Sequence, residues 1–159
     1  ALNEALQAAL NPAGVALVRG GRTYRVGDKV MQLRNDYDRS VFNGDVGFVA
    51  SIDLEETSMV VRFEERDVLF EGADLDDLVL AYACTVHKSQ GSEYPAVVVP
   101  LLTSHFVMLS KNLLYTAVTR GKRLVVLVAS PRALELALSR HRREERRTRL
   151  SARLAEILQ

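Results

Sequence analysis

Two apolar runs with a helical stretch between them constrain the fold of this chain more than any other feature. The first run covers residues 96–101. The second lies in the predicted strand at residues 123–129, which begins with an arginine and is otherwise apolar. Strands that are apolar on both faces are typical of a parallel sheet covered on both sides. Between the runs, Ser110 is a favourable N-cap for a helix over residues 111–120, and Gly121 is expected to end that helix as its C′ residue. This order predicts an α/β fold in which helices flank a parallel sheet.

Other helices are predicted towards both ends of the chain. Leucines at helical spacing predict a helix over residues 2–10, and Asn11-Pro12 ends the pattern. Ser130-Pro131 combines an N-cap with proline at the first helical position, so another helix should begin there. After the charged residues 140–149, leucines at helical spacing predict a last amphipathic helix over residues 150–158.

The stretch from residue 15 to residue 80 has the pattern of a small β-structure. Short alternating runs of about five residues are separated by turn signals, of which Asn43-Gly44 is the strongest. Several short strands between turns are typical of a small antiparallel barrel. The predicted strands are residues 15–18, 29–33, 46–52, 59–63 and 67–70.

The net charge of +1 conceals an uneven distribution. Residues 140–159 contain seven arginines and three glutamates, so the rest of the chain carries a net charge of −3. A strongly basic domain is the usual mark of a nucleic-acid-binding protein. Outside the tail, contacts with nucleic acid must therefore come from a few placed groups. A non-catalytic nucleic-acid-binding module, with a small barrel and a basic helical tail over residues 140–153, stays open as an alternative.

The cysteine, histidine and hydropathy patterns narrow the class of protein. Cys84 is the single cysteine, which rules out an internal disulfide framework and fits a cytoplasmic protein. The three histidines are not spaced for zinc, and no apolar run approaches the roughly 20 residues that span a bilayer. We therefore expect no metal ligands on this chain and no membrane partner. The chain begins without Met, so we expect a piece of a longer protein or a processed product.

A polar loop at residues 85–93 follows a short apolar run, residues 81–84, that resembles a strand. The loop contains many hydrogen-bond donors, a glycine that allows close backbone approach and an acidic residue suited to a ribose hydroxyl. It is either a phosphate-binding loop or a hydrated turn. A hydrolase using Cys84 with His87 is a third interpretation, which we disfavour because a cysteine in an apolar run usually packs. The donors are Thr85, His87, Lys88, Ser89 and Gln90, followed by Gly91 and Glu93.

A second polar stretch lies at residues 112–123. Arg120 stands between a threonine and a glycine just before the second apolar strand. There it can stabilise charge on a transferring phosphoryl group, which is worth about 10³–10⁵ in rate for an arginine finger. Alternatively, it neutralises the helix C-terminus, which is worth under about 1 kcal/mol at an exposed site.

Taken together, these stretches resemble a known family. Thr-Val-His-Lys-Ser-Gln-Gly-Ser-Glu-Tyr-Pro, residues 85–95, looks like motif V of superfamily 1 helicases, and Asn-Leu-Leu-Tyr-Thr-Ala-Val-Thr-Arg, residues 112–120, looks like motif VI. The match is best to RecD-like 5′→3′ DNA helicases, particularly the stand-alone bacterial form. Residues 27–35 and 41–47 resemble the opening of the SH3-like domain that is inserted in the second motor domain of that family.

The resemblance implies an architecture. It implies the second RecA-like motor domain, an α/β domain with a parallel sheet, interrupted by a small SH3-like β-barrel. Residues 1–26 would be the first segment of the motor domain and residues 27–80 the barrel. Residues 81–159 would be the remainder of the motor domain with the basic helical tail.

The resemblance also implies roles for individual residues. Arg120 would be the arginine finger towards the γ-phosphate of ATP. The groups that would face the phosphates of single-stranded DNA lie on one side of the loop at residues 85–93, opposite the ATP-binding side. The barrel would add one weaker candidate. The ATP-binding residues would be Gln90, Gly91, Glu93 and Arg120, and the DNA-binding residues Thr85, His87, Lys88 and Asn35.

One part of the family's machinery is absent from this sequence. No Gly-x-x-x-x-Gly-Lys-[Ser/Thr] motif occurs, and no Asp-Glu pair ends an apolar strand where it could hold Mg²⁺. We expect an N-terminal RecA-like domain of the same protein to supply both elements. The chain alone should therefore hydrolyse no meaningful amount of ATP.

Overall fold

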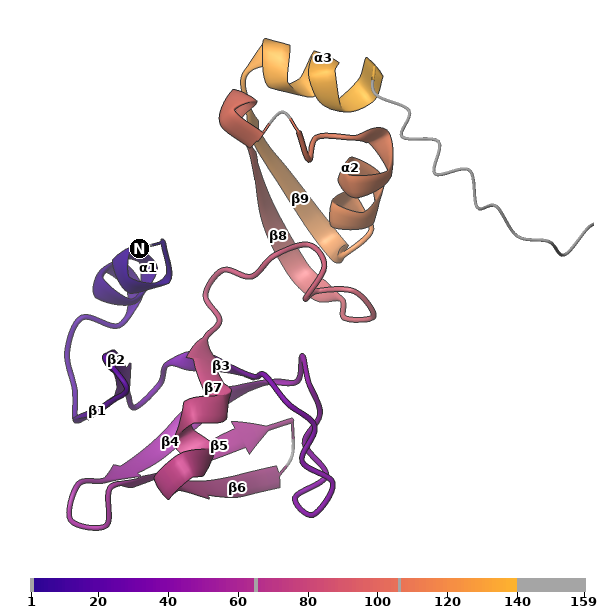
Figure 1. Cartoon of the computed structure of the whole chain (residues 1–159). Coiled ribbons are helices and arrows are strands. Elements are labelled where there is room, and N and C mark those ends of the chain that lie inside the picture. The colour runs from indigo at the N-terminus through magenta and orange to yellow at the C-terminus, as the bar shows by residue number, and fades with distance from the viewer. Residues whose placement is uncertain (1, 65, 106, 140–159) are drawn as a thin grey trace, which may run out of the picture. The chain divides into compact units, whose positions relative to one another are not determined.

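The computed structural model describes residues 2–64, 66–105 and 107–139. These residues form two compact units, Ala1–Ser89 and Gln90–Gln159, which we describe separately (Figure 1). The predicted tail and last helix lie outside the described residues. The domain boundaries at residues 26/27 and 80/81 stay a prediction.

The first unit is built on a five-stranded antiparallel sheet with the strand order β6-β5-β4-β3-β7 (Figure 1). A helix and a two-stranded hairpin precede the sheet, and a short 3-10 helix leads into its last strand. The small antiparallel structure and the helix over residues 2–10 are confirmed. The elements are α1 (Leu2–Leu10), β1 (Ala16–Arg19), β2 (Arg22–Arg25), β3 (Lys29–Gln32), β4 (Val46–Asp53), β5 (Ser58–Phe63), β6 (Arg66–Glu71), η1 (Gly72–Asp77) and β7 (Leu78–Leu80).

One core joins the hairpin to the sheet. Leu17 and Tyr24 of the hairpin belong to the same buried cluster as Met59, Phe70 and Leu75. The strand β2 was not predicted, because it contains a single apolar side chain, Tyr24, between charged and hydroxyl residues. The core of the sheet is therefore shared with a separate hairpin, one strand of which the local sequence does not identify.

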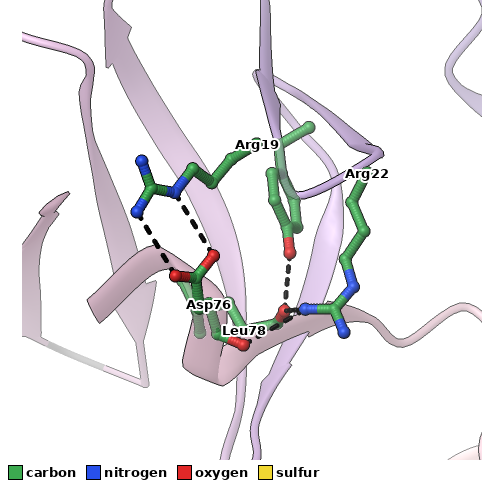
Figure 2. Close-up of polar contacts among 5 residues, drawn as sticks. Arg19, Arg22, Asp76 and Leu78 are labelled. Atoms are coloured by element: carbon green, nitrogen blue, oxygen red, sulfur yellow. Dashed lines mark hydrogen bonds and ion pairs between the residues drawn. The ribbon is translucent and has the colours of Figure 1, made fainter. Parts of the chain in front are cut away.

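Polar contacts fix the hairpin to the corner between η1 and β7 (Figure 2). Arg19 makes a paired contact with the Asp76 carboxylate, at 3.2 and 3.3 Å. Arg22 donates to the carbonyl oxygens of Asp76 and Leu78, at 3.1 and 3.0 Å. The buried Tyr24 hydroxyl donates to the same Leu78 carbonyl oxygen at 2.5 Å, and burial raises the pKa of Tyr24. These bonds satisfy the carbonyl groups at the end of η1.

The second unit contains a parallel strand pair with two helices. β8 (Tyr94–Leu101) runs parallel to β9 (Gly121–Ala129), with Ala96 opposite Leu124, which confirms the predicted parallel sheet. The short η2 (Thr103–His105), α2 (Lys111–Val118) and α3 (Pro131–Ser139) complete the described part of this unit (Figure 1).

Both predicted N-caps of the second unit are confirmed. The Ser110 hydroxyl oxygen accepts from the Leu113 amide at 3.2 Å, and the Ser130 hydroxyl oxygen accepts from the Ala133 amide at 3.2 Å. A small core forms where Leu101 meets Ala133 and Ala137 of α3. Local capping signals therefore identify where both helices begin.

The prediction for the end of α2 was wrong. The helix ends at Val118 with Thr119 as its C-cap, and Gly121 begins β9 instead of acting as a left-handed C′ residue. The glycine is required by close packing. A Cβ at Gly121 would lie 2.6 Å from Val125 Cγ2 and 2.9 Å from the Leu124 carbonyl oxygen.

Two further expectations for the parallel sheet were wrong. Residues 81–84 form no strand, since β7 ends at Leu80. The strands β8 and β9 are not covered on both faces by the described residues, as Val98 is 66% exposed and Val128 55% exposed. Side chains on the opposite face, such as Val99, pack against the small core instead. Apolar composition therefore identified the strands correctly but not their coverage.

Candidate functional site

The first group of candidate residues forms a tight turn at the end of the first unit. The Ser89 amide donates to the Thr85 carbonyl oxygen at 3.2 Å, and the Lys88 amide donates to Thr85 Oγ1 at 3.3 Å. The buried Ser89 hydroxyl donates to the Val86 carbonyl oxygen at 2.8 Å. The turn leaves His87 and Lys88 exposed, so both side chains can reach a phosphate.

A loop of the small sheet lies beside this turn. A Cβ at Gly44 would lie 3.7 Å from the Lys88 carbonyl oxygen, so the predicted Asn43-Gly44 turn contacts the Lys88 turn. Gly44 has a φ of +98°, a backbone conformation that favours glycine. The structure therefore brings the barrel loop to the predicted DNA-binding turn.

The side chain of Asn35 organises that loop. Its Oδ1 accepts from the Asn43 amide at 2.9 Å, and its Nδ2 donates to the Tyr37 hydroxyl at 3.2 Å. The Tyr37 and Phe42 rings meet edge to face, with centroids 6.0 Å apart and planes at 73°. Tyr37 is 75% exposed and Phe42 44% exposed. Sequence reasoning missed this aromatic pair, although two aromatic residues in a polar loop are a signal that could have identified it.

A cavity of about 550 Å³ in the first unit reaches the same turn. Thr85 and Lys88 line it together with Asn3 and Ala83, while Leu2 and Leu80 add apolar walls. Cys84 also lines the cavity and is exposed, contrary to the expectation that it packs. The apolar run at residues 81–84 therefore borders an open space.

The second group of candidate residues lies in the second unit, at the amino-terminal edge of the β8–β9 pair. Residues 90–93 immediately precede β8, and Arg120 immediately precedes β9, as its position before the second apolar run predicted. The Tyr94 amide donates to the Arg120 carbonyl oxygen at 2.8 Å, which holds the two strand starts together. Motif-like residues far apart in the sequence therefore meet at one edge.

The Arg120 guanidinium connects α2 to the loop before β8. Nε donates to the Thr116 carbonyl oxygen at 3.1 Å, and Nη1 donates to the Ser92 carbonyl oxygen at 3.0 Å. Nη2 lies 3.2 Å from Thr119 Oγ1. Through these bonds the half-buried guanidinium both caps the end of α2 and fixes the adjoining loop.

The loop itself is open to a ligand. Gly91 has a φ of +85°, and among the described residues nothing lies within 4 Å of the position that its Cβ would occupy. Gln90 and Glu93 are exposed, and Glu93 Oε2 lies 3.3 Å from Lys122 Nζ. An exposed ion pair of this kind contributes about 0–1 kcal/mol, so Glu93 can exchange this partner at little cost.

The part of the chain that the structure describes contains no group of three or more His, Cys, Asp or Glu side chains that could hold a metal ion. In the same residues, no helix is long and apolar enough to cross a membrane.

Comparison with known proteins identifies the family. The SH3 domain of ATP-dependent RecD-like DNA helicases matches residues 2–63, and the UvrD-like helicase C-terminal domain matches residues 80–128. The ATP-dependent RecD2 DNA helicase of Deinococcus radiodurans is 41% identical over 155 residues, which are 96% of this chain and 21% of that protein. The chain belongs to the RecD-like helicases. The resemblance drawn from residues 85–95 and 112–120 is thereby confirmed.

Other RecD-like relatives agree with this assignment. The RecBCD enzyme subunit RecD of Mycobacterium tuberculosis is 34% identical over 114 residues, covering 72% of this chain and 20% of that protein. The RecD-like chain spans about a fifth of the length of these curated relatives.

Solved helicase structures support the fold of the RecD-like chain. A structure of two coordinating Pif1 helicases at forked double-stranded DNA matches with a TM-score of 0.55 and 26% identity, over 75% of this chain and 30% of that one. Bacteroides Pif1 bound to single-stranded DNA matches with a TM-score of 0.54 and 27% identity, over 67% and 30%. The α/β RecA-like class with an SH3-like domain is confirmed.

Proposed function

We propose that the chain supplies one side of an ATP-driven DNA helicase and completes its nucleotide site with an N-terminal RecA-like domain of the same protein. The observation that carries this proposal is the position of Arg120. Its guanidinium lies at the strand edge beside the Ser92 carbonyl, in the same unit as the open backbone of Gly91. A fixed cation next to an approachable backbone is the chemistry that a polyphosphate requires.

Four residues of the second unit fit ATP. Gly91 offers unobstructed backbone, while Gln90 and Glu93 are exposed and available to the phosphates and the ribose. Arg120 donates to three protein oxygens, and phosphate oxygens would be stronger acceptors because both partners would then be charged. Bound ATP would supply the free energy of phosphoryl transfer. Arg120 would act as the arginine finger that stabilises charge on the γ-phosphate.

Mg²⁺ does not fit the described part of this chain, since no suitable ligand cluster occurs there. We assign it to the N-terminal RecA-like domain, which would also supply the P-loop. That domain and single-stranded DNA are the proposed partners of the chain.

The single-stranded DNA site in this proposal is the Thr85–Ser89 turn with the adjacent loop. Thr85, His87 and Lys88 would contact backbone phosphates. Asn35 would act mainly by holding the loop, because both ends of its amide are engaged within the protein. Bases would stack on Tyr37 and Phe42, as aromatic side chains commonly bind single strands. The continuous stretch of residues 85–93 would couple this site to the ATP site.

The test is to join the chain to an N-terminal half that carries a P-loop. We expect ATP hydrolysis that rises with single-stranded DNA and that neither part shows alone. Hydrolysis by the N-terminal half that is unaffected by this chain, with or without DNA, would contradict the proposed function.

Tyr37→Ser should weaken the binding of an oligothymidylate to the 159-residue chain by about five- to 150-fold. Stacking of one base on an aromatic side chain contributes about 1–3 kcal/mol, which corresponds to that range. Fluorescence anisotropy of a labelled oligonucleotide at constant salt measures the dissociation constant. Tyr115→Ser is the matched control, since Tyr115 is 71% exposed on α2 and should leave affinity unchanged. Equal effects of the two variants would exclude Tyr37 as a stacking platform.

A further inference from the structure

A buried carboxylate lies at the turn between β2 and β3. Asp28 is 0% exposed and accepts four hydrogen bonds. Its Oδ2 accepts from Gln7 Nε2 and from the Arg25 amide, the latter at 2.7 Å. Its Oδ1 accepts from Asn11 Nδ2 at 2.7 Å and from the Tyr82 hydroxyl at 2.8 Å. Burial of a carboxylate is costly unless such donors surround it. The Asp28 carboxylate therefore holds its four donors in place.

The donors to Asp28 come from segments far apart in the sequence. Gln7 belongs to α1, Asn11 directly follows that helix, Arg25 ends β2, and Tyr82 lies two residues beyond β7. The carboxylate therefore ties the segment that leaves the sheet to the helix that begins the unit. Burial, and then the bond to Asp28, raise the pKa of Tyr82.

A second helix side chain holds the next residue of the same segment. Asn3 Nδ2 donates to the Ala83 carbonyl oxygen at 3.0 Å, and the Ala83 amide donates to Asn3 Oδ1 at 2.7 Å. Both backbone groups of Ala83 are thus satisfied by one amide of α1. At Ala83 these bonds replace the ladder bonds that a strand would have made.

These contacts end two residues before the turn that carries Thr85 and Lys88. We propose that Asp28, Tyr82 and Asn3 form a clamp that positions the Thr85–Ser89 turn for single-stranded DNA. Asp28 holds the Tyr82 side chain and Asn3 holds the Ala83 backbone, so all three act on the turn through residues 82–83 and are positioning residues. The effect on DNA binding rests on the proposed function, whereas the restraint on the turn does not.

The test uses the complete 159-residue chain and removes the clamp without removing Asp28. Tyr82→Phe deletes one hydroxyl, Asn3→Ala deletes the amide, and the double variant deletes both. Each lost hydrogen bond corresponds to about a two- to tenfold change in an opening equilibrium. We expect amide exchange at Ala83 and Ser89 to accelerate by that factor for each variant, with exchange at Val61 in the centre of β5 unchanged. NMR-detected hydrogen exchange measures all three amides.

Tyr24→Phe is the matched control. It also removes a tyrosine hydroxyl, in this case a buried one that donates to Leu78 outside the clamp. It should leave the ratio of Ser89 to Val61 exchange unchanged. Exchange at Ser89 that stays constant in the double variant, or that changes only in proportion to Val61, would overturn the clamp.

Oligothymidylate binding separates this inference from the proposed function. We expect the double variant to bind several-fold more weakly, as Lys88→Ala should. If Lys88→Ala weakens binding and the double variant does not, the clamp has no positioning role and the inference fails alone. If Lys88→Ala has no effect either, the turn is not the DNA site and the proposed function fails there.

Discussion

Arg120→Ala, in this chain joined to an N-terminal half with a P-loop, should lower the rate of DNA-stimulated ATP hydrolysis by about 10³-fold or more. The affinity for ATP should change little, because an arginine finger acts on charge that develops in the transition state. Steady-state kinetics measures kcat, and a fluorescent ATP analogue measures binding. Full turnover by the alanine variant would reduce Arg120 to a cation at the end of α2.

Two companion variants separate those roles. Arg120→Lys keeps a positive charge near the Thr116 and Ser92 carbonyl oxygens, so it should preserve the thermal stability of the chain. It should still lose most of the turnover, since an ammonium group does not reproduce the planar fork of guanidinium. Arg132→Ala removes an exposed arginine from α3 and should change neither quantity. Full turnover by the lysine variant would show that charge alone is sufficient.

Phe70→Ala should have the largest effect on folding, a loss of about 3–5 kcal/mol in the free energy of unfolding. Phe70 is 1% exposed, and its ring centroid lies 6.0 Å from that of Phe63. The Arg39 guanidinium carbon lies over the same ring, 5.6 Å from its centre. Truncation leaves a cavity in the core shared by the hairpin and the sheet. Urea unfolding followed by circular dichroism measures the change.

The neighbouring residue provides the control for this prediction. Leu69 lies on the same strand, points to the opposite side and is 49% exposed. Leu69→Ala should cost under about 1 kcal/mol, because little apolar area returns to water. Similar losses for the two variants would mean that the β6 face bearing Phe70 is not the core of this unit.

Much of the fold could be predicted where the signal is local. Ser110 and Ser130 cap their helices as expected, since a cap depends on residues three positions away. The strand β2 could not be predicted because its stability comes from Tyr24, whose hydroxyl bonds to Leu78 and whose ring enters the sheet core. The exposure of β8 could not be predicted either, because composition reports which faces are apolar and not what covers them.

The candidate site divides in the same way. The sequence alone identified the family and singled out Thr85 to Glu93 and Arg120 as candidates, because their order and type form a pattern along the chain. Only the tertiary structure decided what those residues contact. Arg120 bonds to a carbonyl 28 positions away, and Tyr82 bonds to a carboxylate 54 positions away. Such partners are chosen by the packing of distant segments, and no local pattern encodes that packing.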